Sequence, residues 1–369
     1  MRERTILYGV CGIGNGHTLR QLPLIEHFAE SARIVIFAYE SSYGFYSDRF
    51  AADERITVLE VAVPYYVGNR DGIDFDATRT LGSNRKDYAT INGRAMAEAE
   101  RVIGTPDIVI SDYEPVCARY AYGHGSPLVT IDQQSKYLIG RFPEELHGRT
   151  YLDETARLKL FFPEANERIA CSFFDVPDRI PGYEVRIFAP ILRESVVRTV
   201  NVPDHPDSIL VYLTAQDGLR QDVSEIVEIC RSRPDIRFDV FAPDTKMDGS
   251  IGNVSIHRHG STAFDTALTR CSGIVSTAGH TLLSEAMHLG IPVFAMPLPE
   301  VYEQQMNAEV IDRNGFGSRH DAFDRRSLGE FVDRLDGFRE AIRRDADVLL
   351  RGDGKSDVIR FIETKYFSA

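Results

Sequence analysis

The sequence predicts an α/β protein of two Rossmann-like domains, each built on a parallel sheet. Short apolar runs typical of buried strands alternate with longer stretches typical of helices, which is the pattern of parallel sheets with right-handed crossovers. The length of 369 residues exceeds one ordinary core and suits two domains. The same alternation also restarts near residue 208, where we place the second domain.

The first half opens with a strand, a glycine-rich turn and a helix. The apolar run 5–10 precedes Gly12, Gly14 and Gly16, and a helix is expected at about 18–30. A second apolar run comes within a few residues and completes one βαβ unit. The other elements expected in this half are strands at 32–39, 56–61, 108–111, 128–131 and 168–173 and a helix at 93–103.

The second half repeats this order after a linker. Residues 181–195 contain a short strand that ends in proline, and the polar segment 202–206 carries two more prolines, as interdomain connections often do. We expect an N-terminal domain over 1–189, a C-terminal domain over 195–350 and a last helix within 351–369. The elements expected in the second domain are strands at 208–213, 237–241, 254–257, 273–276 and 293–296 and a helix at 223–231.

Composition indicates a globular protein and argues against several partners. Hydrophobic residues make up 43% of the chain and charged residues 26%, as in ordinary globular domains. The 42 basic residues are outnumbered by 55 acidic ones and form no basic cluster, so nucleic acid is not expected as a partner. No stretch approaches the roughly 18 apolar residues of a membrane span, so any membrane contact would be peripheral. A homodimer stays open.

The five cysteines are scattered, odd in number and without a Cys-x-x-Cys pair, which argues against a disulfide framework or a zinc site. The N-terminal apolar run is short and lacks a small-residue cleavage site, so it predicts a strand and not a signal peptide. We therefore expect a cytoplasmic protein. Two Asp-x-Asp triplets, at 74–76 and 345–347, come after no clear strand, so we assign no metal and no bound cofactor.

The most informative motif is a strand, a turn of small residues and a helix that carries Glu285. Backbone N–H groups at such a helix start are unpaired, and with the helix dipole they favour anionic oxygens. The residues at this start are Gly279, His280, Thr281 and Leu282. Glu285 lies one turn beyond Thr281 on the same face, which suits a carboxylate that accepts hydrogen bonds from ribose hydroxyls. The motif therefore predicts a phosphorylated ligand.

This spacing resembles the donor-sugar signature of the GT-B glycosyltransferases, which include the bacterial UDP-N-acetylglucosamine transferases of peptidoglycan synthesis and the plant secondary-metabolite transferases. The resemblance implies that Glu303, Gln304 and Gln305 hold hydroxyls of the transferred sugar. It also implies that the last helix crosses back to the first domain. The resemblance further implies that the two domains face each other across a central cleft. Thr277, Thr281 and Leu282 depart from the plant signature, and the chain has no tryptophan, so a plant-type donor preference is not carried over.

Two loops complete the expected donor site. The resemblance places the nucleobase beside the loop after the strand 254–257, which offers His257 and His259, although an ordinary loop is the alternative. The turn that begins at Thr214 faces the same crevice and would touch the diphosphate.

His17 and Asp112 are the candidate proton-transfer pair. His17 comes after the glycine-rich turn, and Asp112 ends the strand 108–111; strand ends on one edge of a parallel sheet share a crevice, so the two could meet. Histidine suits removal of a hydroxyl proton, and a carboxylate can fix its tautomer. The resemblance implies this role, since a histidine in the first loop pairs with such an aspartate in inverting plant-type enzymes. The alternative is that His17 hydrogen-bonds its helix start and Asp112 caps the next helix.

The acceptor is expected on the first domain. Long polar loops in compact domains are often mobile substrate elements, and the candidates are the segments 64–94 and 133–141. A solvated loop is the alternative for both.

The function expected is an inverting, metal-independent glycosyltransferase. It would move a sugar from a nucleotide-diphosphate sugar, foremost a UDP-sugar, to a hydroxyl of a small-molecule, lipid or glycan acceptor. A nucleotide-sugar epimerase or hydrolase on the same fold is the alternative, and a purely binding role is another. An NAD(P)-dependent oxidoreductase also stays open, because Gly12, Gly14 and Gly16 partly match Gly-x-Gly-x-x-Gly and Glu40 ends the second strand.

Overall fold

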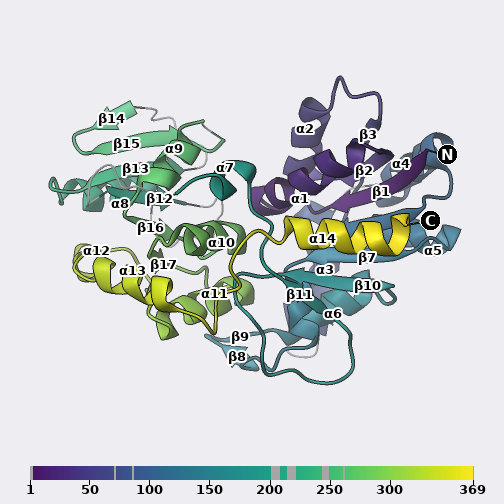
Figure 1. Ribbon diagram of the computed structural model, residues 1–369. Helices are drawn as coiled ribbons and strands as arrows, with labels where there is room; N and C mark the ends of the chain where they lie inside the picture. Colours follow the sequence, from purple (N-terminus) through teal and green to yellow (C-terminus); the bar gives the residue numbers. More distant parts are fainter. Residues whose placement is uncertain are drawn as a thin grey trace.

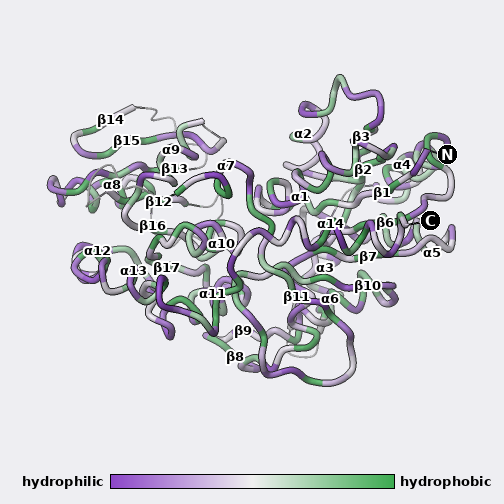
Figure 2. The backbone as a smooth tube through the Cα atoms, viewed as in Figure 1, coloured by the Kyte–Doolittle hydropathy of each residue, from purple (hydrophilic) through white to green (hydrophobic). Residues whose placement is uncertain are grey.

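The protein forms two seven-stranded sheets, one from each half of the chain (Figure 1). In this computed structural model the described residues are 3–69, 72–84, 87–200, 208–213, 222–242, 249–260 and 262–368. Helices flank both sheets, and the predicted α/β fold with two parallel-sheet units is confirmed. Figure 2 shows hydrophobic positions along the central strands and hydrophilic ones along the outer loops.

The first sheet is parallel, with the order β11-β10-β7-β6-β1-β2-β3. Its strands are β1 (Arg4–Val10), β2 (Ala32–Ala38), β3 (Ile56–Glu60), β6 (Ile108–Asp112), β7 (Leu128–Asp132), β10 (Glu167–Cys171) and β11 (Arg186–Phe188). The strand order reverses beside β1, and ligands of such sheets bind in the crevice at the carboxyl ends of the strands at that point. Val10 and Asp112 are register partners there.

Helices cover both faces of this sheet. They are α1 (Asn15–Ala29), α2 (Glu40–Arg49), α4 (Tyr88–Ile103), α5 (Pro115–His124) and α6 (Leu152–Phe161). Shorter elements are β4 (Val67–Asn69), β5 (Gly72–Asp74), α3 (Phe75–Thr80), η1 (Gly82–Asn84), η2 (Gln134–Leu138), β8 (Glu145–Leu146) and β9 (Arg149–Thr150). Alternate residues of β1 face opposite cores, as the strand period requires: Ile6 packs with Leu24 and Phe28 of α1, whereas Leu7 packs with Ala99 of α4.

The second sheet has the order β14-β15-β13-β12-β16-β17-β18, with only the β14–β15 pair antiparallel among the described strands. Its strands are β12 (Ser208–Tyr212), β13 (Arg237–Ala242), β14 (Gly249–Ile251), β15 (Val254–Arg258), β16 (Gly273–Ser276), β17 (Val293–Ala295) and β18 (Gly317–Arg319). Its helices are α8 (Val223–Arg231), α9 (Ala263–Arg270), α10 (His280–Leu289), α11 (Tyr302–Arg313), α12 (Arg325–Val332) and α13 (Leu335–Arg344). Neither β14 nor β18 is predicted from the sequence.

The chain passes between the sheets twice. The first passage leads from β11 through α7 (Glu194–Val197), and the second leads from α13 to α14 (Lys355–Ile362) and the turn Glu363–Phe367. In Figure 1 α14 lies along the first sheet, and its Val358 and Ile362 are buried in the same core as α1. Among the described residues no helix is long and apolar enough to cross a membrane.

Candidate active site

His17 and Asp112 meet at the carboxyl ends of β1 and β6. Gly14 has a φ of 71°, a left-handed conformation that suits glycine and turns the chain from the loop after β1 into α1. His17 then lies in the first turn of the helix, which begins three residues earlier than predicted. Its Nδ1 is 3.0 Å from Oδ1 of Asp112, and 14% of its side chain is exposed. With Nδ1 facing the carboxylate, Nε2 is the ring nitrogen that remains for a substrate.

Neither residue takes the alternative role of a helix cap. The cap of α5 is Glu114, whose carboxylate accepts hydrogen bonds from the N–H groups of Val116 and Cys117 at 2.7 and 2.8 Å. The start of α1 has no side-chain cap. The bonds of His17 and Asp112 are therefore not explained by helix capping.

Two further residues of α1 hold Asp112, and sequence reasoning missed both. Arg20 donates to the two carboxylate oxygens, from Nε at 2.9 Å and from Nη2 at 2.5 Å, and Gln21 donates from Nε2 at 3.0 Å. The phenol of Tyr8 donates to Oε1 of Gln21 at 2.6 Å. The sequence does contain a signal for them, namely their spacing: Arg20 and Gln21 come three and four residues after His17 and therefore lie on the same face of the helix.

The cluster sets the charge of its members. Burial favours the neutral form of Asp112, but Arg20 and His17 outweigh it and hold the pKa of this carboxyl below its usual range. Burial also disfavours the imidazolium of His17, but Asp112 outweighs it and raises the pKa of His17 to about 10. Arg20, whose Nη2 lies 2.7 Å from Nδ1 of His17, opposes that rise. Asp112 thus makes His17 a stronger base than a free histidine, but one that keeps its own proton until the pH approaches about 10.

Backbone strain gathers at the same edges of the two sheets. Glu40, Tyr113 and Ala278 lie directly or nearly directly after β2, β6 and β16, and their φ angles are 50°, 58° and 60°. A residue other than glycine in this region costs about 1–3 kcal/mol and persists only where its surroundings hold it. Asn307 of α11 does so for Ala278, donating from Nδ2 to its carbonyl at 3.0 Å.

The helix start predicted to bind phosphate lies against the helix of His17. Thr281, the second residue of α10, donates from Oγ1 to the carbonyl of Gly16 at 3.3 Å. A side chain at Gly16 would not fit, since its Cβ would lie 2.9 Å from that hydroxyl. Gly279 and Leu282 are half-buried, and His280 is buried. Burial, helped by the cations Lys136 and Arg20, holds the pKa of His280 well below its usual range.

Glu285, the predicted ribose ligand, is bound by the linker. Its carboxylate is buried and accepts two hydrogen bonds from Arg193, at 2.6 Å from Nε and 2.8 Å from Nη2. Arg193 also pairs with Asp265 of α9. Burial raises the pKa of Glu285, and Arg193 opposes the rise. Each carboxylate oxygen can accept a further donor, so ribose binding by Glu285 stays a prediction.

The three residues predicted to hold the sugar point in different directions. Gln304 accepts from the N–H of Leu298 at 2.9 Å, and Gln305 donates to the carbonyl of Leu298 at 2.9 Å. Gln305 is buried, and its amide oxygen also accepts a hydrogen bond from Arg319 at 3.0 Å, so both ends of the amide bond to other residues of the protein. Glu303 is half-buried. Asp112 is the main group that raises the pKa of Arg20, and the charge of Glu303 adds to that rise.

The two histidines predicted beside the nucleobase lie in aromatic stacks at the end of β15. His257 stacks on Phe241 with ring centroids 4.7 Å apart and pairs with Asp239 through Nε2 at 2.8 Å. His259 stacks on Tyr212 at 4.7 Å with almost parallel rings. Thr214, predicted to touch the diphosphate, lies outside the described residues.

Comparison with known proteins identifies the family. The model of glycosyl transferase family 1 matches residues 4–336. The chain belongs to this family. Two curated relatives from Methanosarcina acetivorans are both described as uncharacterized glycosyltransferases. The first is 23% identical, over 98% of this chain and 96% of its own length, and the second is 20% identical, over 85% of this chain and 84% of its own length. As a member of glycosyl transferase family 1 the protein is a transferase enzyme, which does not support the oxidoreductase alternative.

Solved structures show which fold this glycosyltransferase has. It is similar to CalG4, the calicheamicin glycosyltransferase, with a TM-score of 0.61 and 19% identity over 93% of both chains. It is also similar to LpCGTa in complex with UDP, with a TM-score of 0.63 and 13% identity over all of both chains. A third similar structure is UDP-glucose: anthocyanidin 3-O-glucosyltransferase in complex with UDP, with a TM-score of 0.65 and 12% identity over 93% of both chains. The fold is therefore GT-B, as the sequence motif predicts.

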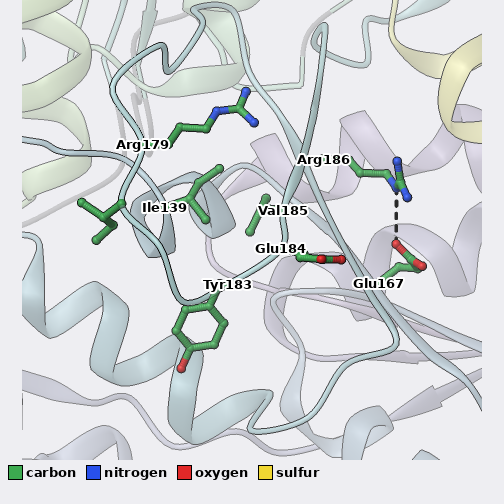
Figure 3. A pocket seen from close by; sticks show the side chains of 8 residues that line it. Ile139, Glu167, Arg179, Tyr183, Glu184, Val185 and Arg186 are labelled. Atoms are coloured by element: carbon green, nitrogen blue, oxygen red, sulfur yellow. Dashed lines mark hydrogen bonds and ion pairs between the residues drawn. The ribbon is translucent and has the colours of Figure 1, made fainter.

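A cavity of about 300 Å³ in this glycosyltransferase lies at the outer edge of the first sheet, near β11 (Figure 3). It is lined by Ile139, Glu167, Arg179, Ile180, Tyr183, Glu184, Val185 and Arg186. Ile139 belongs to the segment 133–141 that is predicted to bind the acceptor, but none of the residues predicted for catalysis or for the donor lines this cavity. In the part of the chain that the structure describes, no three His, Cys, Asp or Glu side chains are grouped to hold a metal ion.

Proposed function

We propose that this family 1 member is an inverting, metal-independent glycosyltransferase that uses a nucleoside-diphosphate sugar, foremost a UDP-sugar. The observation that carries the proposal is the pairing of His17 with Asp112 at 3.0 Å beside the start of α10, because it puts a base next to an anion-binding helix end. The UDP complexes of LpCGTa and the anthocyanidin enzyme support UDP as the nucleotide. Five buried cysteines without disulfides are compatible with the cytoplasm, where we place the enzyme.

In this mechanism the acceptor hydroxyl binds beside His17. Nε2 takes the hydroxyl proton while the acceptor oxygen attacks the anomeric carbon from the side opposite the diphosphate. The new bond joins that carbon to the acceptor oxygen, and the bond to the phosphate oxygen breaks, so the configuration inverts. Asp112 stabilises the imidazolium through Nδ1, and Arg20 and Gln21 keep the carboxylate in place.

The leaving diphosphate gains negative charge as its bond to the sugar breaks. Unpaired N–H groups at the start of α10 and the helix dipole would stabilise that charge, and the Thr281 hydroxyl could turn from Gly16 to a phosphate oxygen. The acceptor is a small molecule, a lipid or a glycan bound on the first domain. Contact between the halves at Gly16 and Thr281 would exclude water that otherwise hydrolyses the donor.

The test begins with a thermal-shift screen against UDP, TDP, GDP, UDP-sugars and NAD(P), since a ligand of the folded state raises the melting temperature. A nucleoside diphosphate should stabilise the protein. Incubation with the stabilising sugar nucleotide and a panel of hydroxyl acceptors, with NMR of the anomeric proton as the readout, should then give an inverted product. Donor turnover without any acceptor would instead indicate the hydrolase or epimerase, and a retained configuration would contradict the role of His17.

A further inference from the structure

Lys136 is a buried lysine without an acidic partner. It belongs to η2, directly after β7, and has no exposed surface. Its ammonium donates to Oε1 of Gln133 at 2.5 Å and lies 4.9 Å from the ring centre of Phe174 and 5.2 Å from that of Tyr137. Among the described residues it forms no ion pair. A lysine is rarely buried in this way unless something compensates its charge.

This lysine comes from the first half but reaches the start of α10. Phe174, under its ammonium, packs on Phe173 with ring centroids 5.0 Å apart, and Phe173 packs on His280 at 5.2 Å. The positive charge of Lys136 lowers the pKa of His280, so the two groups act on each other. Two aromatic side chains, Phe174 and Phe173, therefore connect Lys136 to the helix end that is predicted to bind phosphate.

The same lysine also lies near the start of α11. Tyr137, the next residue, packs on Tyr302 with ring centroids 5.8 Å apart, and Tyr302 directly precedes Glu303, the predicted sugar ligand. Burial lowers the pKa of Lys136 to about 7, and the charge of Glu303 is the largest of those that oppose this. The lysine is thus placed between the two elements of the second half that are expected to hold the donor.

Three polar atoms, in two residues that contact the Lys136 ammonium and in His280, lack a hydrogen-bond partner within the described ranges of the chain. They are Nε2 of Gln133, Oη of Tyr137 and Nε2 of His280, all of them buried. A buried polar atom left without a partner destabilises a protein, and such atoms usually bind something in the functional state. A lysine ammonium, a glutamine amide donor and two neighbouring polar atoms form a set that suits an oxyanion.

We propose that Lys136 and Gln133 bind an anionic oxygen of the donor, at a subsite between the two halves of the molecule. The inference rests on the proposed function, because it assumes a nucleotide-sugar donor. Two groups of such a donor carry the required charge: the β-phosphate, or the carboxylate of a uronic acid sugar. At the β-phosphate the ammonium would stabilise the leaving group, and at a sugar carboxylate it would select the donor. Since Lys136 is fully buried, the donor enters while the halves are apart.

The test compares Lys136→Met with wild type by calorimetric titration of UMP, UDP, UDP-glucose and UDP-glucuronate. Weaker binding of the last three by at least about tenfold, with UMP unchanged, identifies the β-phosphate as the partner. A loss confined to UDP-glucuronate identifies the sugar carboxylate. Equal affinities of the variant and wild type for all four overturn the proposal. Lys159→Met, which removes an exposed lysine of the same half, is the matched control.

The melting temperature of the Lys136→Met protein distinguishes a lysine that binds the donor from one that stabilises the fold. Because no described acid pairs with Lys136, the Lys136→Met protein should melt at the same or a higher temperature while it binds the donor less well. A lower melting temperature with unchanged binding would mean that the lysine serves the fold. If the methionine variant does not fold, Gln133→Glu gives the same answer, because the new carboxylate would pair with the Lys136 ammonium and repel an anionic ligand, so the affinity for the same nucleotides should fall.

The two proposals fail in different ways. If the wild-type protein binds no nucleoside diphosphate of the thermal-shift screen, the proposed function fails and this inference fails with it. If the wild type binds UDP, and Lys136→Met binds every nucleotide as tightly, only this inference is wrong.

Discussion

The proton-transfer cluster of the first half and the donor elements of the second half differ in what their polar groups bind. His17, Asp112, Arg20 and Gln21 bond mainly to one another, at distances of 2.5–3.0 Å. All four come from α1 and the end of β6, two elements fixed to one core. The base is therefore preorganised, and its geometry does not depend on a ligand.

The donor elements instead bond to parts of the protein that a ligand could replace. Glu285 is held by Arg193 of the linker, Thr281 by the carbonyl of Gly16, and Gln304 by the N–H of Leu298. A donor that uses Glu285 or Thr281 has to share or displace these partners. If these residues act as proposed, the catalytic group is ready before binding, whereas the donor site is completed by binding. Variants of either region can therefore break this contrast or sharpen it.

The largest effect is expected for His17→Ala. Loss of a positioned base should lower the transfer rate by about 10²- to 10⁴-fold, while the affinity for UDP stays within about twofold, because the described bonds of the His17 ring go to Asp112 and Arg20 and not to the residues predicted to hold the donor. Steady-state kinetics and calorimetric titration measure the two quantities. His27→Ala is the matched control, since this histidine lies on the same helix and pairs with Glu363 at 2.9 Å. Equal loss of rate and UDP affinity would break the contrast.

Asp112→Asn should slow transfer on the order of 10²-fold and also change its pH dependence. A base acts only when unprotonated, so the wild-type rate should rise with pH toward the pKa of His17, about 10 in the ligand-free protein. Asp112 is the group that raises this pKa, and its loss leaves burial and the Arg20 charge to lower it. The rising limb of kcat/KM against pH should therefore move to lower pH in the variant. If the rising limb of the pH profile does not move in the variant, His17 is not the base whose titration it reports.

Glu285→Gln tests the other side of the contrast. Hydrogen bonds to a charged group contribute about 1.5–3 kcal/mol, so UDP binding should weaken by about tenfold to a hundredfold. Asp265→Asn is the control, since it also takes a carboxylate from Arg193 but lies outside the predicted ribose site. Calorimetric titration should show a loss for the first variant alone. A similar loss in both would mean that Arg193, and not the ribose, depends on Glu285.

Thr281→Val should have a smaller effect on UDP binding, about two- to tenfold, because a single neutral hydrogen bond contributes about 0.5–1.5 kcal/mol. The shape of the side chain is kept, so the contact with Gly16 loses only its hydrogen bond. Thr80→Val is the control, since that hydroxyl bonds only to carbonyls of its own helix region at 3.0 and 3.1 Å. Unchanged UDP affinity in Thr281→Val would assign the hydroxyl to the contact between the halves alone.

The features best predicted from the sequence are those set by the ends of strands. Val10 and Asp112 are neighbours because parallel strands end at one edge, so the meeting of His17 and Asp112 could be expected from two short apolar runs. The start of α10 is likewise marked by small residues before an apolar helix. Both predictions depend on local periodicity and on the geometry common to parallel sheets, and neither needs side-chain detail.

The rest depends on contacts between distant residues. Arg193 and Glu285 are 92 positions apart, and no local pattern links a linker arginine to a helix glutamate. Gln304 and Gln305 look equivalent in the sequence, but consecutive helix residues differ by about 100° in direction, so only the packed helix shows that Gln305 turns inward. The buried Lys136 belongs to the same class, because burial of a lysine results from the way the two halves pack.

The smallest effect is expected for metal removal. The leaving diphosphate is proposed to meet the start of α10, and the two Asp-x-Asp triplets have local uses: Asp74 accepts from the N–H of Ala77 at 2.8 Å, and Asp345 from that of Leu349 at 2.8 Å. Transfer should therefore proceed at the same rate after treatment with EDTA and should not rise when Mg²⁺ or Mn²⁺ is added. A strict requirement for a divalent ion would show that the helix start does not suffice, and the donor site would then be completed by a metal as well as by its substrate.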